Sequence, residues 1–365
     1  MSDRFLVSAV GAVIAIDTAA RDRSFQRRAR EAWADALIAA DVPADATVPV
    51  RDAVSDEEAL SLLSTDVTLA ALAHRQGDQV WMLHATGLAD DSGRVIVLSA
   101  ASGTGKTTAA RHLSRHYAYV SDETIAIESS GVVVPYRKPL SIIEPDASHK
   151  VQTALSSIDG GRALPAGLRV AKIVVLDRTA DGPLEPELDE LDVATALEFL
   201  APQTSYLGHV PAPLQLIDAL LTATGGAVRL RYREVSTLDA LIGTLIAVEP
   251  AGVPPIPPSG TSNDQREINA PEGSYARAEA VDALDLGDGR LAVLQRSADG
   301  GRVNVLDGIG PAIWAAANAS DLAAIVRAVV DVHGAPEGLD ATQAVASAAQ
   351  QLVDDGLLRR ISAQA

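Results

Sequence analysis

The sequence predicts a mixed α/β protein (mixed α+β) with more than one domain, and three features of the chain predict it. A short apolar run at 95–98 leads through a glycine-bearing loop into a helical pattern, as in a buried strand, a turn and a helix. The segment 249–274 is rich in proline and poor in large apolar residues, which favours an extended linker. After it, three short strand patterns precede three helical patterns.

Chain length supports a division into domains, because 365 residues exceed what one hydrophobic core usually holds. We expect an N-terminal lobe at 1–80, a central domain at 81–248, a proline-rich linker at 249–276 and a C-terminal domain at 277–365. The lobe has a strand-like start and a helical pattern at 27–40 but no chemical motif, so the sequence does not disclose its role.

Composition excludes several classes of function. The net charge of −18 would repel a phosphate backbone, so we expect no nucleic-acid partner. The chain has no cysteine, which excludes disulfides, thiol catalysis and thiolate metal sites. The apolar stretch at 5–16 is shorter than the roughly 18 residues of a membrane span, and no signal-cleavage pattern follows it. We therefore expect a soluble cytoplasmic protein with no membrane partner.

The central segment contains a phosphate-loop pattern. Its small residues allow consecutive backbone N–H groups to surround phosphate oxygens, and the start of the following helix adds partial positive charge. We predict that Lys106, as an exposed loop lysine, reaches the β and γ phosphates of a nucleotide and that Thr107 holds Mg²⁺. Ala100 stands where the usual pattern has its first glycine. The predicted nucleotide-binding residues are Ser102, Gly103, Thr104, Gly105, Lys106, Thr107 and Thr108.

An acidic pair, Asp122 and Glu123, follows the helix after the loop and interrupts a strand pattern at 117–127. The spacing from Lys106 is about one helix and a return turn, so a carboxylate can come back to the phosphate end. One carboxylate can then act as general base toward an acceptor hydroxyl while the other holds the metal. We assign Asp122 as the base and Glu123, with Thr107, to the metal. A surface turn between two strands is the alternative.

Three further patterns lie in the central segment. Arg137 and Lys138 follow a strand pattern and either neutralise phosphate charge or are exposed cations beside a turn. The acidic run at 177–192 contains two prolines, which predicts a solvent-exposed loop. The segment 226–234 predicts a strand, and Ser236 is the expected N-cap of a closing helix.

These motifs resemble the HPr serine kinases and their bacterial relatives. The likeness rests on the order Leu83-His84-Ala85, the phosphate loop and Val120-Ser121-Asp122-Glu123, and it covers about residues 80–145. It implies ATP as donor with Mg²⁺, a catalytic base and metal-linked role for the acidic pair, and His84 close to the site. A hydrogen-bonded histidine beside a buried strand is an equal alternative for His84. The Arg-Gly-rich second signature of HPr kinase/phosphorylases is absent, so the resemblance extends neither to HPr as acceptor nor to phosphorylase activity.

The C-terminal segment predicts a winged-helix-like module. Strand patterns at 281–286, 290–295 and 302–306 are separated by glycine-rich turns. Pro311 can begin the first helix, Ser320 can cap the second, and Asp340 can cap the third. Gly356 is the expected stop of that third helix.

This module resembles the PqqD family of peptide-recognition elements from ribosomal natural-product pathways. The likeness rests on the phrases at 305–310, 313–314 and 352–358. It implies that a leader peptide adds as an extra strand beside the third strand and packs against the helix at 342–355. The implied peptide-binding residues are Arg302, Val303, Asn304 and Val305. A module used only for oligomerisation or packing within the chain is the alternative.

The two resemblances together predict a kinase, related to lasso-peptide tailoring kinases, that phosphorylates a Ser or Thr hydroxyl of a small precursor peptide. The C-terminal module would hold the leader, and tethering would raise the effective concentration of the acceptor. A non-catalytic adaptor whose nucleotide site regulates peptide delivery is one alternative. A metabolite kinase with an accessory domain is another, and homo-oligomerisation stays open.

Overall fold

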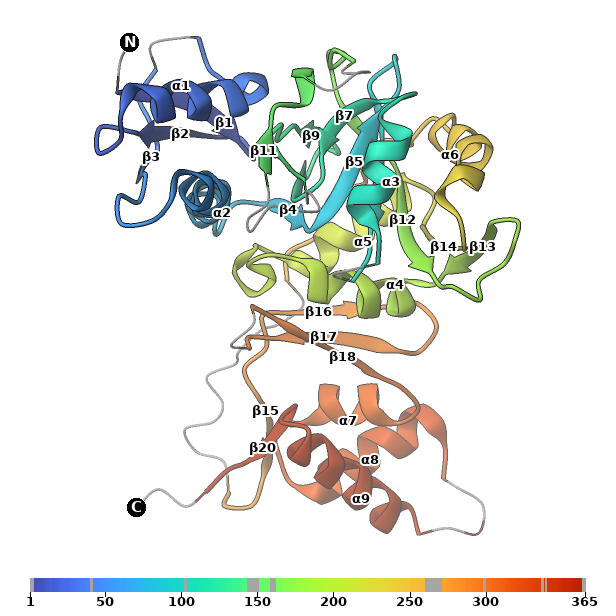
Figure 1. The fold of residues 1–365 in the computed structure, drawn as a ribbon. Coiled ribbons are helices and arrows are strands. Elements are labelled where there is room, and N and C mark those ends of the chain that lie inside the picture. The colour runs from blue at the N-terminus through green and yellow to red at the C-terminus, as the bar shows by residue number, and fades with distance from the viewer. Residues whose placement is uncertain are drawn as a thin grey trace. The chain divides into compact units, whose positions relative to one another are not determined.

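The computed structural model describes residues 3–39, 42–101, 104–142, 151–157, 162–259, 271–297, 300–335, 338 and 340–362. It confirms the predicted mixed α/β class (Figure 1). The chain forms two compact units, Met1–Pro211 with Leu216–Ile256 and Ala212–Gln215 with Pro257–Ala365. The N-terminal lobe and the central segment thus belong to one unit, and the finer division into four segments stays a prediction.

The N-terminal lobe contains a three-stranded sheet and two helices. Strands β1 and β2 are antiparallel, and β3 is parallel to β2. The helix predicted at 27–40 is α1, which ends earlier, at Ala32; it begins at Arg23, where the Asp22 carboxylate caps it by accepting from the Phe25 N–H. The bounds are β1 Arg4–Ala9, β2 Ala12–Asp17, β3 Ala46–Pro49, α1 Arg23–Ala32 and α2 Asp56–His74.

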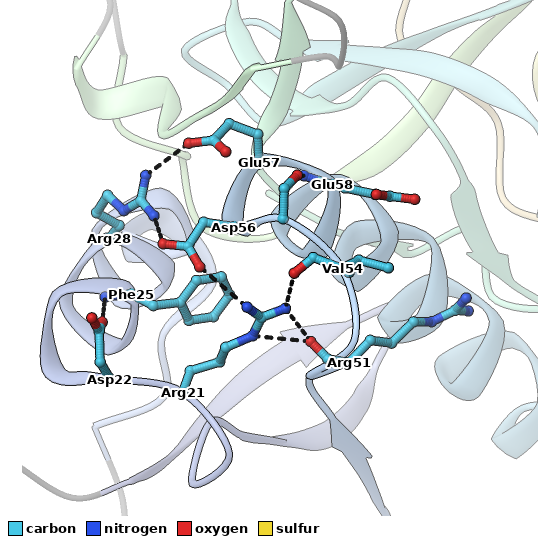
Figure 2. A network of polar contacts seen from close by, with 10 residues as sticks. Arg21, Asp22, Phe25, Arg28, Arg51, Val54, Asp56, Glu57 and Glu58 are labelled. Carbon is cyan, nitrogen blue, oxygen red and sulfur yellow. Dashed lines mark hydrogen bonds and ion pairs between the residues drawn. The ribbon is translucent and has the colours of Figure 1, made fainter.

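A polar network joins the starts of α1 and α2 (Figure 2). The Arg21 guanidinium donates to the Val54 carbonyl at 2.8 Å and lies 3.2 Å from the Asp56 carboxylate. Arg28 also pairs with Asp56, and its Nη1 lies 3.3 Å from Glu57 Oε1. The carboxylates lie in the first turn of α2, where negative charge also stabilises the helix dipole. The network ties the two helix starts together, while the apolar core of the lobe lies between its sheet and helices.

The main sheet of the first unit has six strands in the order β13-β14-β12-β6-β5-β7. Strands β6, β12 and β14 are parallel. Since β5 is antiparallel to both β6 and β7, β7 also runs in their direction. The carboxyl ends of these four strands therefore lie at one edge of the sheet. The bounds are β5 Ala85–Ala89, β6 Arg94–Ser99, β7 Ala118–Ser121, β12 Arg169–Arg178, β13 Glu187–Leu191 and β14 Ala227–Tyr232.

Two helices, α3 (Lys106–Leu113) and α6 (Asp239–Ile246), pack on this sheet through one apolar core. The predicted strands at 95–98 and 226–234 are confirmed as β6 and β14. Ser236 does not cap α6: it lies in a short 3₁₀ turn, and Leu238 stands at the N-cap without a side-chain hydrogen bond. Burial of Leu238 and Ile242 in this core, rather than a cap, fixes where α6 begins.

The prediction of a loop throughout 177–192 is wrong, because residues 187–191 form the edge strand β13. One arginine of β14, Arg231, pairs with two acidic residues of β13. Arg231 Nη2 lies 2.7 Å from Glu187 Oε2, and its Nε lies 2.8 Å from Asp189 Oδ2. Opposite charges on neighbouring strands stabilise the pairing of a segment that is too acidic to be recognised as a strand by itself.

The remaining elements of this unit connect the lobe to the sheet. Strands β4, β8 and β9 form a small sheet, and Met82 and Ala126 from it share the apolar core of the lobe. The predicted strand break at the acidic pair is confirmed, since β7 and β8 flank it. The further bounds are β4 Val80–Leu83, β8 Ile125–Glu128, β9 Val133–Val134, β10 Leu140–Ile142, β11 Val151–Thr153, α4 Val193–Leu200 and α5 Pro213–Ala223.

The second unit confirms the predicted order of three strands and three helices. Asp340 caps α9 as predicted, and Gly356, with a φ of +75°, follows its end. Asp321, not Ser320, caps α8, because its carboxylate is the group that accepts from the Ala324 N–H. The elements are β16 Asp282–Asp285, β17 Leu291–Gln295, β18 Arg302–Leu306, α7 Gly310–Ala316, α8 Leu322–His333 and α9 Ala341–Asp354.

A second sheet in this unit was not expected from the sequence. Three short strands pair in the order β19-β15-β20, namely Asn318–Ser320, Tyr275–Arg277 and Leu358–Arg360. Within the part of the chain that the structure describes, no helix is long and apolar enough to cross a membrane.

Candidate functional site

The predicted phosphate loop joins β6 to α3 at the carboxyl edge of the main sheet. Gly105 stands at the N-cap of α3 with a φ of +98°, a conformation that strains any residue with a Cβ. The Thr104 hydroxyl donates to the Ala101 carbonyl at 2.6 Å and so holds the loop against itself. Thr107 and Thr108 are exposed in the first turn of the helix. Ser102 and Gly103 lie outside the described residues.

Lys106 is buried, with 7% of its surface exposed, so the prediction of an exposed loop lysine is wrong. Its Nζ donates to the Ala100 carbonyl at 2.6 Å, which folds the side chain back across the loop that precedes it. This burial lowers the pKa of Lys106, and the charge of Glu123 opposes the shift. The ammonium therefore lies inside the loop, the position from which it can neutralise a bound phosphate.

The acidic pair follows β7 at the same edge of the sheet. Asp122 is buried, and its Oδ1 accepts a hydrogen bond from the Tyr119 hydroxyl at 2.6 Å. Burial, and then the Asp122 charge, raise the pKa of Tyr119 well above its ordinary value, so the phenol stays a donor. The side chain of Glu123 is more exposed, at 38%. The two carboxylates thus have different surroundings, which suits different roles.

Lys138 links the two carboxylates. Its Nζ lies 3.6 Å from Asp122 Oδ1 and 3.4 Å from Glu123 Oε2, and its side chain is 3% exposed. The alternative of an exposed cation beside a turn is therefore wrong for Lys138, whereas Arg137 pairs with Asp35 at 3.6 Å. The sequence signal was weak: a lysine between an arginine and a proline, after a strand pattern. Nothing local indicates which carboxylates such a lysine meets.

His84 lies directly after β4, with its Nδ1 3.7 Å from Glu123 Oε1. That separation is too long for a hydrogen bond. The His84 side chain is 37% exposed; its partial burial lowers the pKa of His84, and the charge of Lys106 lowers it further, while Glu123 opposes both effects. His84 is therefore neutral at pH 7 and lies near the phosphate-loop lysine and the acidic pair. Of the predicted site residues that the structure describes, those in the first unit come from three segments of chain, and Lys138 adds a fourth at the same edge.

The magnesium prediction matches the chemistry of the residues present but not a closed metal site. Within the described ranges, no group of three or more histidine and carboxylate side chains could hold a metal by itself. A hydroxyl from Thr107 and a carboxylate from Glu123 are the kind of oxygen ligands that Mg²⁺ takes when nucleotide phosphates supply the others.

The predicted peptide-binding residues belong to the second unit, in β18. This strand pairs with β17 and ends the sheet order β16-β17-β18 among the residues that the structure describes. Leu306 belongs to the apolar core of the unit, whereas Val303 and Val305 are half-buried and are not among the residues of that core. Changing either valine therefore does not remove a core side chain.

Comparison with known proteins identifies no family. No family model matches the chain, and no curated protein matches it. Among solved structures, the chain is similar to the Hpr(Ser) kinase/phosphatase from Coxiella burnetii, with 14% sequence identity over 45% of this chain and 93% of that chain. The TM-score is 0.27. A likeness of this size identifies neither the activity nor the substrate of the present chain.

Proposed function

We propose that this chain is an ATP-dependent phosphotransferase that acts on a Ser or Thr hydroxyl of a ribosomally synthesised precursor peptide. One observation carries the proposal: a strand–loop–helix with a buried loop lysine and an acidic pair meet at one sheet edge. In a solvent-exposed turn between two strands, Asp122 would be exposed, whereas here it is buried in contact with Tyr119 and Lys138. A pure adaptor, likewise, needs no candidate base beside its nucleotide.

In the proposed reaction, the acceptor oxygen attacks the γ-phosphorus of ATP. An oxygen–phosphorus bond forms, the bond from the γ-phosphorus to the bridging oxygen breaks, and its electron pair leaves with ADP. Asp122 takes the hydroxyl proton. The contacts of Asp122 to Tyr119 and Lys138 both involve Oδ1, so Oδ2 is the oxygen that we assign to this proton.

The phosphate charge requires cations that are already in position. Lys106 supplies one from inside the loop. Mg²⁺ bound with the nucleotide neutralises further charge, and Thr107 and Glu123 are the residues that would hold it. The positive charge of Lys138 attracts both carboxylates. It offsets the repulsion between them and so positions the pair.

The second unit would hold the leader of the precursor. The support is that β18 ends its sheet among the described residues, because an end strand can pair with an added peptide strand through its backbone. Use of the same strand for oligomerisation is the competing explanation, and the experiment below separates the two.

The test uses the intact chain, ATP, Mg²⁺ and a short Ser- or Thr-containing precursor peptide that has a leader half and a core half, with intact-mass measurement of the peptide. The proposal predicts a gain of one phosphoryl group, slowed strongly when the leader half of the peptide is deleted. Phosphorylation that is independent of the leader would remove the peptide-handle part. Binding of ATP and peptide without any mass change would favour the adaptor, and a small-molecule acceptor would favour the metabolite kinase.

A further inference from the structure

We propose that a cavity beside the phosphate loop binds the base of the nucleotide donor, with Phe199 as its stacking surface; this inference rests on the proposed function. The cavity has a volume of about 300 Å³. Its walls come from the end of β6 and the loop, the end of β12, and α4 with the turn after it. That volume lies at the lower end of the range for small-molecule sites.

The order of the strands predicts which end of a bound nucleotide points toward the acidic pair. In the sequence β12-β6-β5-β7, the phosphate loop follows β6, and the acidic pair follows β7 on one side of it. The cavity lies on the opposite side, toward β12. A nucleotide whose terminal phosphate faces Asp122 must carry its nucleoside away from the acidic pair. The cavity is then the space that the base can enter.

The side chains in the cavity suit a flat aromatic ring. Phe199 lines it and is 37% exposed, an unusual exposure in a chain with only three phenylalanines. The Arg229 guanidinium lies 5.7 Å from the centre of that ring. It is held there by Asp177, whose Oδ2 accepts from Arg229 Nε at 3.0 Å. A base can stack on this paired aromatic and cationic surface.

Polar groups in the same cavity suit a base that carries an exocyclic amino group. Ser99 also lines the cavity, is 1% exposed, and its Oγ has no hydrogen-bond partner within the part of the chain that the structure describes. A buried hydroxyl without a partner is costly unless a ligand supplies one. The carboxylate of Asp177 is a second acceptor at this wall. These groups suit the exocyclic amino group of a base, and adenine, the base of the proposed donor ATP, carries one.

The experiment compares Mg-ATP with magnesium tripolyphosphate, which has the phosphates but no base, by calorimetric titration of the intact chain. The wild type should bind ATP more tightly than tripolyphosphate. Phe199→Ala should weaken ATP binding about tenfold, the size that base–aromatic stacking supports, and leave tripolyphosphate binding unchanged. Phe199→Leu keeps an apolar side chain but removes the aromatic ring, so it should also weaken ATP binding. Leu69→Ala, which truncates an exposed apolar side chain of α2, should change the binding affinity for neither ligand.

The outcomes separate this inference from the proposed function. Two results would overturn the base site: equal affinity of the wild type for ATP and tripolyphosphate, or weaker binding of both ligands in Phe199→Ala. Neither result would contradict phosphate binding by the loop. If Phe199→Ala leaves the ATP affinity unchanged and raises the KM for the peptide acceptor, the cavity binds the acceptor. That result would also overturn the base site. A wild type that binds neither ligand would contradict the phosphate loop, and with it both proposals.

Discussion

Lys106 is the residue on which nucleotide binding depends most directly. Lys106→Ala removes the buried ammonium that folds over the loop, so we expect ATP affinity to fall and any transfer to slow by about 10²–10³-fold. Arg111→Ala, which changes an exposed residue of the same helix, is the matched control and should behave as the wild type. Calorimetry with Mg-ATP measures the effect. Equal affinities in the Lys106 variant and the wild type would contradict the phosphate-loop role.

His84 gives a prediction about pH. Its pKa is lowered in the folded chain, so below its ordinary value of 6.5 the unfolded chain binds more protons than the folded chain. Stability therefore falls as the pH decreases from 7 to 5. Urea unfolding of His84→Gln should show a shallower fall over this window than the wild type. Replacement of the exposed His116 is the control, and equal slopes in His84→Gln and the wild type would contradict the partial burial of His84 near Lys106.

Single residues show where sequence reasoning stops. The glycine at position 105 and the acidic pair after β7 were predictable, because local spacing and backbone conformation identify them. The burial of Lys106 was not, since it depends on the side chain folding back to the Ala100 carbonyl. Lys138 was left open for a related reason: its partners Asp122 and Glu123 lie in the turn after β7, whereas Lys138 lies between β9 and β10, and a sequence does not give the distance between such segments.

At the scale of elements, β18 carries a prediction about peptide capture. Val303→Glu places a charge on the proposed docking strand, and we expect leader affinity, measured by fluorescence polarisation with the intact chain, to fall at least about fivefold. ATP affinity should not change. Val332→Glu, at a position of α8 that is 70% exposed, is the control for added charge. If Val303→Glu alters the oligomeric state but not leader binding, the strand serves association between copies of the chain.

Elements were predictable where their signals are local. The strand–loop–helix at 94–113 and the strand order of the second unit follow from apolar runs, glycine turns and caps. Strand β13 was missed because Arg231 of β14 pairs with two of its carboxylates, and the acidic segment alone does not indicate this stabilisation. The short strands β15, β19 and β20 were missed because they pair only with segments far away in sequence.

At the scale of the whole molecule, the two units do not divide at one point in the chain. The second unit begins at Pro257 but also includes residues 212–215. Within it, the buried Asp282 carboxylate accepts from the backbone N–H groups of Leu214 at 2.9 Å and Gln215 at 3.3 Å. Pro211 and Pro213 indicate a turn at residue 212, but nothing in the sequence there indicates Asp282 as the partner. A truncation near Gln265, which the linker alone suggests, removes Asp282 from these two donors.

Asp282 therefore gives a prediction about stability. Asp282→Ala leaves two buried N–H groups without their acceptor, and we expect the free energy of unfolding to fall by about 2 kcal/mol. Urea unfolding of the intact chain measures this. Glu279→Ala changes an exposed carboxylate of the same unit and should have little effect. A loss as small as that of the control would show that the contact at residues 214 and 215 contributes little to the fold.

The most direct test of the central claim is whether Lys106 and Asp122 serve one reaction. Transfer to the precursor peptide is measured for Lys106→Ala, Asp122→Asn and the double variant, with Glu123→Gln to check the assignment of the base. Groups that act together are not additive, so the double variant should be about as slow as the slower single variant. Two results would contradict the catalytic centre described above. One is a double variant whose loss of transfer rate equals the product of the two single losses, and the other is full activity in Asp122→Asn with loss only in Glu123→Gln.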